Sequence, residues 1–151
     1  AYGAAVAYTF PFNLALGTAY NVGIRDKNGE EDAKLWLLSA KYDNKAVYAA
    51  LSYADGTDFL ATGKDHTGWE GALGYNFENG FGLMALWNKQ EQEITGGKKT
   101  DAIDYYTLGA QYKFNKNLRV IGEYRINNLD SVAGKATANK DDFQLAARYD
   151  F

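Results

Sequence analysis

His66 is the only histidine in the sequence of 151 residues, and there is no cysteine. Metal sites and catalytic triads each need several such side chains in a defined arrangement, so imidazole or thiolate chemistry has no partners here. His66 follows Lys64 and Asp65 in a long polar stretch, where we expect an exposed loop histidine. The sequence therefore predicts no metal site, no bound cofactor and no enzyme.

Two glycine-containing stretches match ligand-binding loops only in part. Residues 96–100 are similar to the end of a phosphate-binding loop, but Lys99 stands where Ser or Thr is needed, and no helix pattern follows. Residues 26–30 begin like a calcium-binding loop, but Glu31 replaces the required glycine. We expect both stretches to be solvated surface loops.

Charged side chains spread through the chain are the remaining candidates for function. The formal net charge is −3 and Lys and Arg form no block, so the sequence lacks the phosphate-neutralising surface that nucleic-acid binding needs. Fixed charges along a water-filled channel would order water and tune the passage of ions. They could also form ion pairs that keep a barrel wall hydrated and rigid, and both roles can hold together. The candidates for lining such a channel are Arg25, Lys41, Glu70, Lys113, Arg119, Glu123, Arg125 and Arg148.

Strands must position these charges, because apolar and polar residues alternate with a period of two along most of the chain. No run approaches the roughly 20 apolar residues of a membrane-spanning helix. Short turns alternate with longer polar loops, which predicts an antiparallel meander with one short-turn end and one long-loop end. The short turns are residues 11–13, 43–45, 78–80 and 115–117, and the long loops are 26–34, 55–67, 90–101 and 129–142. The predicted strands are residues 2–10, 14–25, 35–42, 47–54, 69–77, 81–89, 105–114, 118–127 and 143–151.

An internal repeat underlies this pattern, with one hairpin in each repeat. The strands that enter the short turns begin at Tyr2, Trp36, Trp69, Tyr106 and Phe143, which are 34, 33, 37 and 37 residues apart. Four of these five strands end in the sequence Tyr-x-Phe. Residues two apart on a strand share a face, so the rings gather on one face at one end of the sheet.

The two faces of the predicted sheet differ in chemistry. One face is apolar from end to end and includes Leu16, Leu38, Leu73 and Leu108, whereas the other is polar, charged or small. A soluble barrel would turn its apolar face inward, and an outer-membrane barrel would turn it towards lipid, with aromatic girdles at the interfaces. Because the Tyr and Phe residues collect where strands meet the short turns, the pattern favours the membrane arrangement.

A strand-built membrane structure must close into a barrel, since every backbone polar group in hydrocarbon needs a partner. Single-chain bacterial barrels use even numbers of strands, and nine is odd. The chain is therefore either a small eight-stranded barrel with one element miscounted or a portion of a larger barrel. Small residues on the polar face, such as Gly3, Ala7, Gly17 and Gly109, suit a wide lumen better than the plugged interior of a small structural or adhesion barrel.

Several segments also match a known family in order and spacing. The most specific is the turn at residues 114–117, Phe-Asn-Lys-Asn, followed by a strand that contains Tyr-Arg-Ile-Asn-Asn-Leu-Asp-Ser at residues 124–131. The strand at residues 36–43 and the final segment at residues 142–151 fit the same pattern. In these segments the chain resembles the general diffusion porins of Gram-negative outer membranes, both the enterobacterial osmoporin and phosphoporin type and the Vibrio major porin type.

This resemblance implies that residues 1–151 form a single portion of a β-barrel, similar to the last nine of sixteen strands. It implies an outer-membrane channel for passive diffusion of small hydrophilic solutes and ions, assembled as a homotrimer. Lipid and lipopolysaccharide would surround it, with the short turns in the periplasm and the long loops outside the cell. Tyr149 and Phe151 would form part of the signal for outer-membrane assembly, and the last strand would pair with a strand upstream of Ala1.

Overall fold

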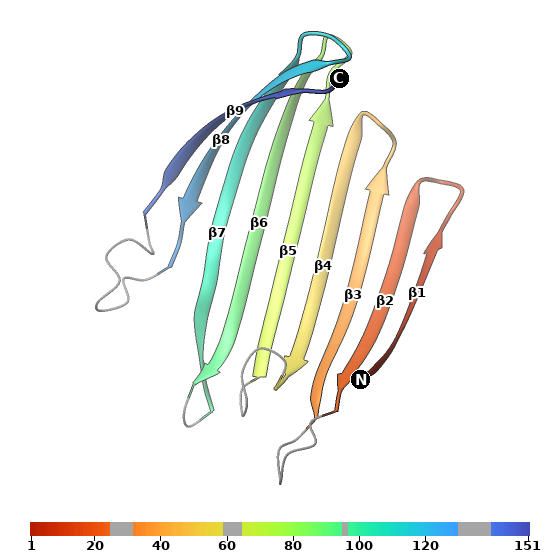
Figure 1. Cartoon of the computed structure of the whole chain (residues 1–151), viewed down its shortest axis with the longest axis vertical. Coiled ribbons are helices and arrows are strands. Elements are labelled where there is room, and N and C mark those ends of the chain that lie inside the picture. Colours follow the sequence, from red (N-terminus) through yellow and green to blue (C-terminus); the bar gives the residue numbers. More distant parts are fainter. Residues whose placement is uncertain (25–31, 59–64, 95–96, 130–139) are drawn as a thin grey trace.

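The computed structural model describes residues 1–24, 32–58, 65–94, 97–129 and 140–151, which form one antiparallel sheet of nine strands (Figure 1). The strand order follows the chain, so each strand pairs with its neighbours in sequence and the predicted all-β meander is confirmed. No helix that could cross a membrane occurs in these five ranges. The strands are β1 (Tyr2–Thr9), β2 (Leu14–Gly23), β3 (Ala33–Asp43), β4 (Val47–Thr57), β5 (Asp65–Asn76), β6 (Phe81–Ile94), β7 (Lys98–Lys113), β8 (Leu118–Asn127) and β9 (Asp142–Tyr149).

The short turns are built by residues that tolerate a left-handed backbone. Asn13 has φ 65° in the turn from β1 to β2, and Gly80 has φ 87° in the turn from β5 to β6. Each of these turns, like the one from β7 to β8, is a three-residue loop whose flanking residues are hydrogen-bonded, as in Phe77 N–H to the Phe81 carbonyl at 2.8 Å. The side chain of Asn115 closes the third by accepting bonds from the backbone of the residues that follow. Turn chemistry thus sets the register at this end.

The cross-strand register separates the side chains as the alternation predicts. Leu38 lies opposite Tyr53, and the next residue, Ser39, lies opposite Ser52. The same separation continues through the sheet to β9, where Leu145 is on the first face. We call the face of Leu38 the apolar face and the face of Ser39 the polar face.

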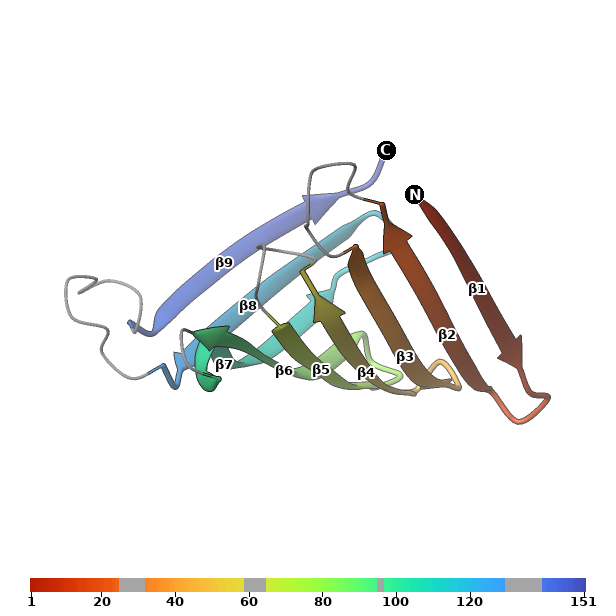
Figure 2. The ribbon, with the colours of Figure 1, turned by 90° about the horizontal axis from the view of Figure 1, so that it is seen from below.

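The sheet curves into an open trough whose rims are β1 and β9 (Figure 2). Side chains crowd on the polar face: a Cβ atom at Gly109 would lie 2.6 Å from Cγ of Met84. On the apolar face, a Cβ atom at Gly71 would meet its nearest neighbour at 3.5 Å, which is ordinary van der Waals contact. Crowding on one side only indicates that the polar face is the concave one.

Almost no hydrophobic core lies inside this sheet. Val22 is the single buried hydrophobic residue among those described, whereas Val6, Leu73 and Leu145 are 69%, 62% and 71% exposed. A soluble domain is stabilised mainly by removing such side chains from water. The apolar convex face therefore needs an apolar environment outside the sheet.

Four strands, β4 to β7, extend at least three residues beyond their predicted ends at the long-loop end. β6 and β7 continue as a hairpin through most of residues 90–101, which were expected to be a loop, and their register shifts between Gln90 and Glu91. β4 and β5 likewise run into the predicted loop 55–67, so His66 is in a strand. Alternation does not mark these extensions, because beyond the apolar band both faces of the strands carry polar residues.

Candidate pore-facing surface

The register brings seven of the eight predicted channel-lining residues onto the concave polar face. Lys113, Arg119 and Arg148 lie directly opposite one another on β7, β8 and β9. Glu123 lies opposite Gly109 and Arg125 opposite Thr107, on the same face. Lys41 on β3 and Glu70 on β5 also belong to it. Arg25, the eighth, lies outside the described residues.

The N-terminal part of the concave face is built almost entirely from small residues. In the first two strands Ala5 faces Ala19, and Ala7 faces Gly17. Such residues keep side-chain volume out of the space in front of the wall. The charged residues are concentrated instead on β7 to β9, so this surface is asymmetric around the trough.

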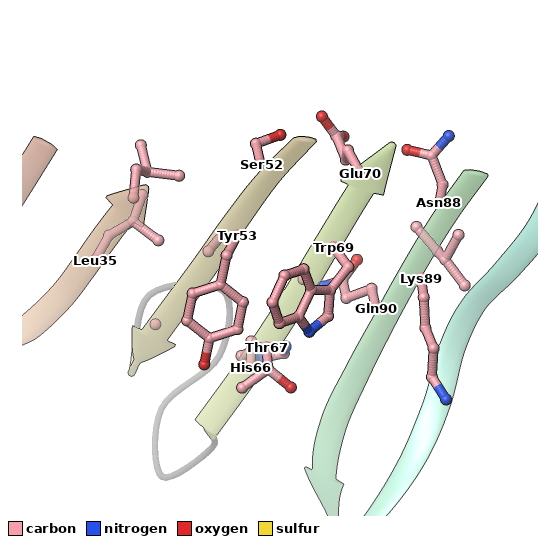
Figure 3. A pocket seen from close by; sticks show the side chains of 15 residues that line it. Leu35, Ser52, Tyr53, His66, Thr67, Trp69, Glu70, Asn88, Lys89 and Gln90 are labelled. Carbon is pink, nitrogen blue, oxygen red and sulfur yellow. The ribbon is translucent and has the colours of Figure 1, made fainter. Parts of the chain in front are cut away.

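A row of hydrogen-bonding side chains crosses the middle of the concave face. Cross-strand pairs place Glu70 between Ser52 on β4 and Asn88 on β6, and Figure 3 shows these three side chains along neighbouring strands. The row continues through Tyr105 on β7 to Asn127 on β8. These groups give the wall a continuous hydrophilic track with one carboxylate near its centre.

Arg125 acts as part of a wall ion pair. Its guanidinium donates a hydrogen bond to the carboxylate of Asp142, which lies opposite it on β9. The same guanidinium lies over the Tyr105 ring, with 5.4 Å from Cζ to the ring centroid. Both partners of Arg125 belong to the wall. Arg125 therefore fits the second of the two predicted roles, an ion pair that keeps the barrel wall hydrated and rigid.

A second group of charges lies at the short-turn end. The Arg119 guanidinium is 3.7 Å from the Asp150 carboxylate, and Arg148 donates a 2.8 Å hydrogen bond to that carboxylate. Lys113, opposite Arg119, makes no ion pair with another described residue. The Asp150 carboxylate thus contacts two of the three cations in this row.

His66 is buried, at 7% exposure, so its prediction as an exposed loop residue is wrong. It lies on β5 between Gly56 and Gln92 of the neighbouring strands, because β4 and β6 extend beyond their predicted ends. Neither ring nitrogen has a hydrogen-bond partner among the described residues. It borders a hollow of ≈ 310 Å³ that is lined by apolar side chains such as Leu35 and by polar ones such as Ser52 and Glu70 (Figure 3).

The hollow beside His66 offers no catalytic arrangement. Within the described ranges, no three His, Cys, Asp or Glu side chains gather in a way that could hold a metal ion. A catalytic imidazole is hydrogen-bonded to a nucleophile and to an orienting group, and neither nitrogen of His66 makes such a bond to a described residue. The apolar face, on the opposite side of the sheet, carries many exposed leucines. These leucines lie between two belts of aromatic rings.

The first belt lies at the short-turn end and follows the predicted Tyr-x-Phe sequences. Rings two residues apart contact each other edge to face: Tyr75 and Phe77 have centroids 4.7 Å apart, and Tyr112 and Phe114 have centroids 4.9 Å apart. Rings with one polar edge favour the boundary between hydrocarbon and water. This belt therefore marks one membrane interface.

The second belt was not identified from the sequence. Trp36, Tyr53 and Trp69 lie side by side on β3, β4 and β5 at the long-loop end, with ring centroids 6.2 Å and 4.6 Å apart. The signal was present, since Trp36 and Trp69 each begin a repeat. From Trp69 to Tyr75 of the first belt the strand covers about 20 Å at about 3.3 Å per residue. This length is comparable with the apolar band of about 25 Å on outer-membrane barrels.

Solved outer-membrane proteins share this fold. The chain superimposes on OmpF of Salmonella typhi, solved in complex with daunomycin, with a TM-score of 0.79 and 25% identity, covering 97% of this chain and 49% of OmpF. It superimposes on the loop L8 deletion mutant of OmpT of Vibrio cholerae with a TM-score of 0.72 and 20% identity, covering 96% of this chain and 51% of that one. The second similarity concerns the fold alone.

Curated relatives agree with the structures. The chain is 30% identical to porin-like protein L of Photobacterium profundum over 99% of its length and 46% of the relative's. It is 31% identical to outer membrane protein YedS of Escherichia coli over 80% of its length and 38% of the relative's. The chain thus spans less than half the length of these relatives. The family model for Gram-negative porins matches residues 1–151. The apolar convex face and the polar concave face agree with this match. The chain belongs to the Gram-negative porins of the outer membrane.

Proposed function

We propose that residues 1–151 form part of the wall of an outer-membrane channel through which small hydrophilic solutes and ions diffuse passively. The observation that carries this proposal is the opposition of the two faces. Leucines and aromatic rings cover the convex side, while small, polar and charged residues cover the concave side. A wall with this polarity separates lipid from water.

The channel-lining role belongs to the charges of the concave face. Lys41, Glu70, Lys113, Arg119, Glu123 and Arg148 present ionisable groups to the water in the lumen, and Arg25 is proposed to join them. Arg125 contributes chiefly to the wall through its pair with Asp142. Fixed charges of this kind favour some ions over others without binding them tightly.

Two other functions fit less well. An enzymatic barrel would need a base with oriented partners, and the ring nitrogens of the one histidine have no hydrogen-bond partner among the described residues. A small closed barrel without a pore would pair β9 with β1, but the described strands form an open sheet with those two at its edges. Passive diffusion requires neither a base with oriented partners nor a pairing of β9 with β1.

The oligomeric state and surroundings follow from the same proposal. OmpT of Vibrio cholerae, which shares the fold at 19% identity and a TM-score of 0.65, is described in a trimer form. We expect a homotrimer for this protein as well. The exposed convex face supports contact with lipid acyl chains, and the long loops are expected to contact lipopolysaccharide. Tyr149 and Phe151 are proposed to serve in recognition by the assembly machinery.

Conductance measurements test the channel directly. The full-length protein that carries this sequence should insert into planar lipid bilayers and produce stepwise current increases. Its conductance should rise in proportion to salt concentration, as expected for a water-filled pore. Insertion without measurable current would contradict the channel and favour a plugged structural barrel.

A further inference from the structure

We propose that the concave face carries an anion-binding subsite at its short-turn end, which takes small anions of two or more charges, such as phosphate and phosphorylated solutes. The subsite consists of Lys113, Arg119 and Arg148, with Lys116 in the adjoining turn. It rests on the proposed channel function, because its anions would reach it from the water of the lumen.

The three cations lie side by side in one cross-strand row. Lys113 is directly opposite Arg119, and Arg119 is directly opposite Arg148. Neighbouring strands are about 4.8 Å apart, so the backbones at these three positions lie within about 10 Å of one another. Like charges directly opposite each other destabilise a sheet unless something compensates them.

The compensation within the chain is incomplete. Asp150 contacts both arginines and neutralises one positive charge. Glu123, the next acid along the concave face of β8, is four residues from Arg119, which is about 13 Å along the strand. Counting Lys116, the group keeps an excess of positive charge at a place where the side chain of Arg148 is 62% exposed and that of Arg119 is 29% exposed.

The surrounding structure forms a receptive hollow. A polar depression of ≈ 160 Å³ is lined by the turn at residues 115–117 together with Lys113, Arg119 and Asp150. Asn115 is held by two bonds from the backbone, and the Asn117 side chain donates to the Asp150 carbonyl at 2.6 Å. The backbone of the turn is therefore fixed by its own hydrogen bonds before any ligand arrives.

The donors match phosphate better than chloride. A guanidinium presents several N–H groups in a plane and can bind two oxygens of one anion at once, whereas a lysine supplies a point charge. Chloride is spherical, so it does not exploit the planar arrangement of the N–H groups. Because it carries a single charge, it also neutralises only one of the excess positive charges. The same chemistry would also accept the phosphate of a lipid headgroup at the channel mouth, and the test must separate these two sources.

Phosphate inhibition of the channel current tests the subsite. The full-length protein is inserted into phosphatidylcholine bilayers in about 0.1 M KCl, a concentration at which charges within about 10 Å still interact. Inorganic phosphate is added to one side at a time. We expect a saturable decrease in single-channel current, at lower phosphate concentration when it is added on the short-turn side.

Charge-removing variants locate the effect. Arg119→Gln and Lys113→Gln, the second at an exposed position, should each raise the half-effective phosphate concentration about fivefold. This factor corresponds to about 1 kcal/mol, the interaction energy of one charge pair at about 4 Å in water. The matched control is Lys45→Gln, which removes a charge from another short turn and should leave the phosphate response unchanged. Equal responses in the wild type, Arg119→Gln and Lys113→Gln would overturn the subsite.

Two further outcomes separate the possible failures and sources. No current in the wild type would contradict the channel itself, whereas normal current without any phosphate response would contradict the subsite alone. Repeating the titration in phosphatidylglycerol bilayers identifies the natural source of the anion. If phosphate still lowers the current in phosphatidylglycerol, the subsite takes dissolved anions. If phosphate lowers the current in phosphatidylcholine but not in phosphatidylglycerol, the subsite is occupied by lipid headgroups.

Discussion

Leu108 and Thr107 are neighbours on β7 with opposite environments. Leu108 is 53% exposed on the convex face, and Thr107 is 7% exposed on the concave face. In a soluble protein the leucine would be the buried member of such a pair, because each buried leucine side chain contributes roughly 1.5–3 kcal/mol. Lipid acyl chains remove the difficulty, since a leucine in contact with hydrocarbon is already out of water.

Replacing Leu108 by arginine should therefore impair insertion into bilayers. A charged side chain near the midplane of an outer-membrane barrel costs about 2–4 kcal/mol, so Leu108→Arg should lower the free energy of unfolding by about that amount. Urea titration of the full-length protein in vesicles measures it. Gln111→Arg, on the concave face of the same strand, is the control and should change stability by much less; equal losses for both variants would contradict the assigned faces.

Single strands are held in register by their turns, and Gly80 shows how. It has φ 87°, and a Cβ atom there would lie 2.7 Å from the Lys113 carbonyl oxygen. Both the backbone conformation and the neighbouring strand thus exclude a side chain. Asn79 supports the same turn by accepting a hydrogen bond from the Phe81 N–H at 3.0 Å.

Gly80→Ala is accordingly expected to destabilise the β5–β6 hairpin. A left-handed backbone costs a residue with a Cβ atom roughly 1–2 kcal/mol, and the clash with Lys113 adds to it. The matched substitution is Gly71→Ala in the middle of β5, where the added methyl group meets only ordinary contacts at 3.5 Å or more. Unfolding in urea should separate the two variants, and a neutral Gly80→Ala would refute this view of the turn.

The number, order and faces of the strands could be predicted from sequence because a half-apolar sheet imposes a period of two. The prediction failed where that constraint ends. Residues 90–94 and 98–101 pair as strands beyond the apolar band, and both of their faces meet polar surroundings, so no alternation marks them. His66 was missed for a related reason: its burial depends on the neighbouring strands β4 and β6, not on its own local sequence.

The last strand carries a prediction that the structure leaves untested. Phe143, Leu145 and Tyr149 line the convex face of β9, and Tyr149 contacts the ring of Phe151 at a centroid distance of 5.1 Å. If these rings serve in recognition by the assembly machinery, deleting Phe151 should reduce the amount of folded protein in outer membranes. The conductance of the molecules that do assemble should change little. Unaltered membrane levels would count against the signal.

For the whole molecule, the two ends of the sheet should lie on opposite sides of the membrane. Lys98 and Lys99 are exposed in the hairpin at the long-loop end, whereas Lys45 and Lys116 are exposed in short turns. An amine reagent too large for the channel, added to intact cells, should label the first pair only. The second pair should react after the outer membrane is permeabilised. Labelling of Lys116 on intact cells would reverse the topology.

The assignment of lipid to the convex face and water to the concave face can be measured at one depth. Leu51 and Ser52 are consecutive on β4 and belong to opposite faces. Because this sequence contains no cysteine, Leu51→Cys and Ser52→Cys can each carry a nitroxide spin label in a cysteine-free full-length protein. Power-saturation spectroscopy in vesicles then compares collisions with oxygen, which concentrates in lipid, and with a water-soluble nickel complex. We predict that the label at residue 51 collides mainly with oxygen and the label at residue 52 mainly with nickel; the reverse pattern would contradict a water-filled channel on the concave side.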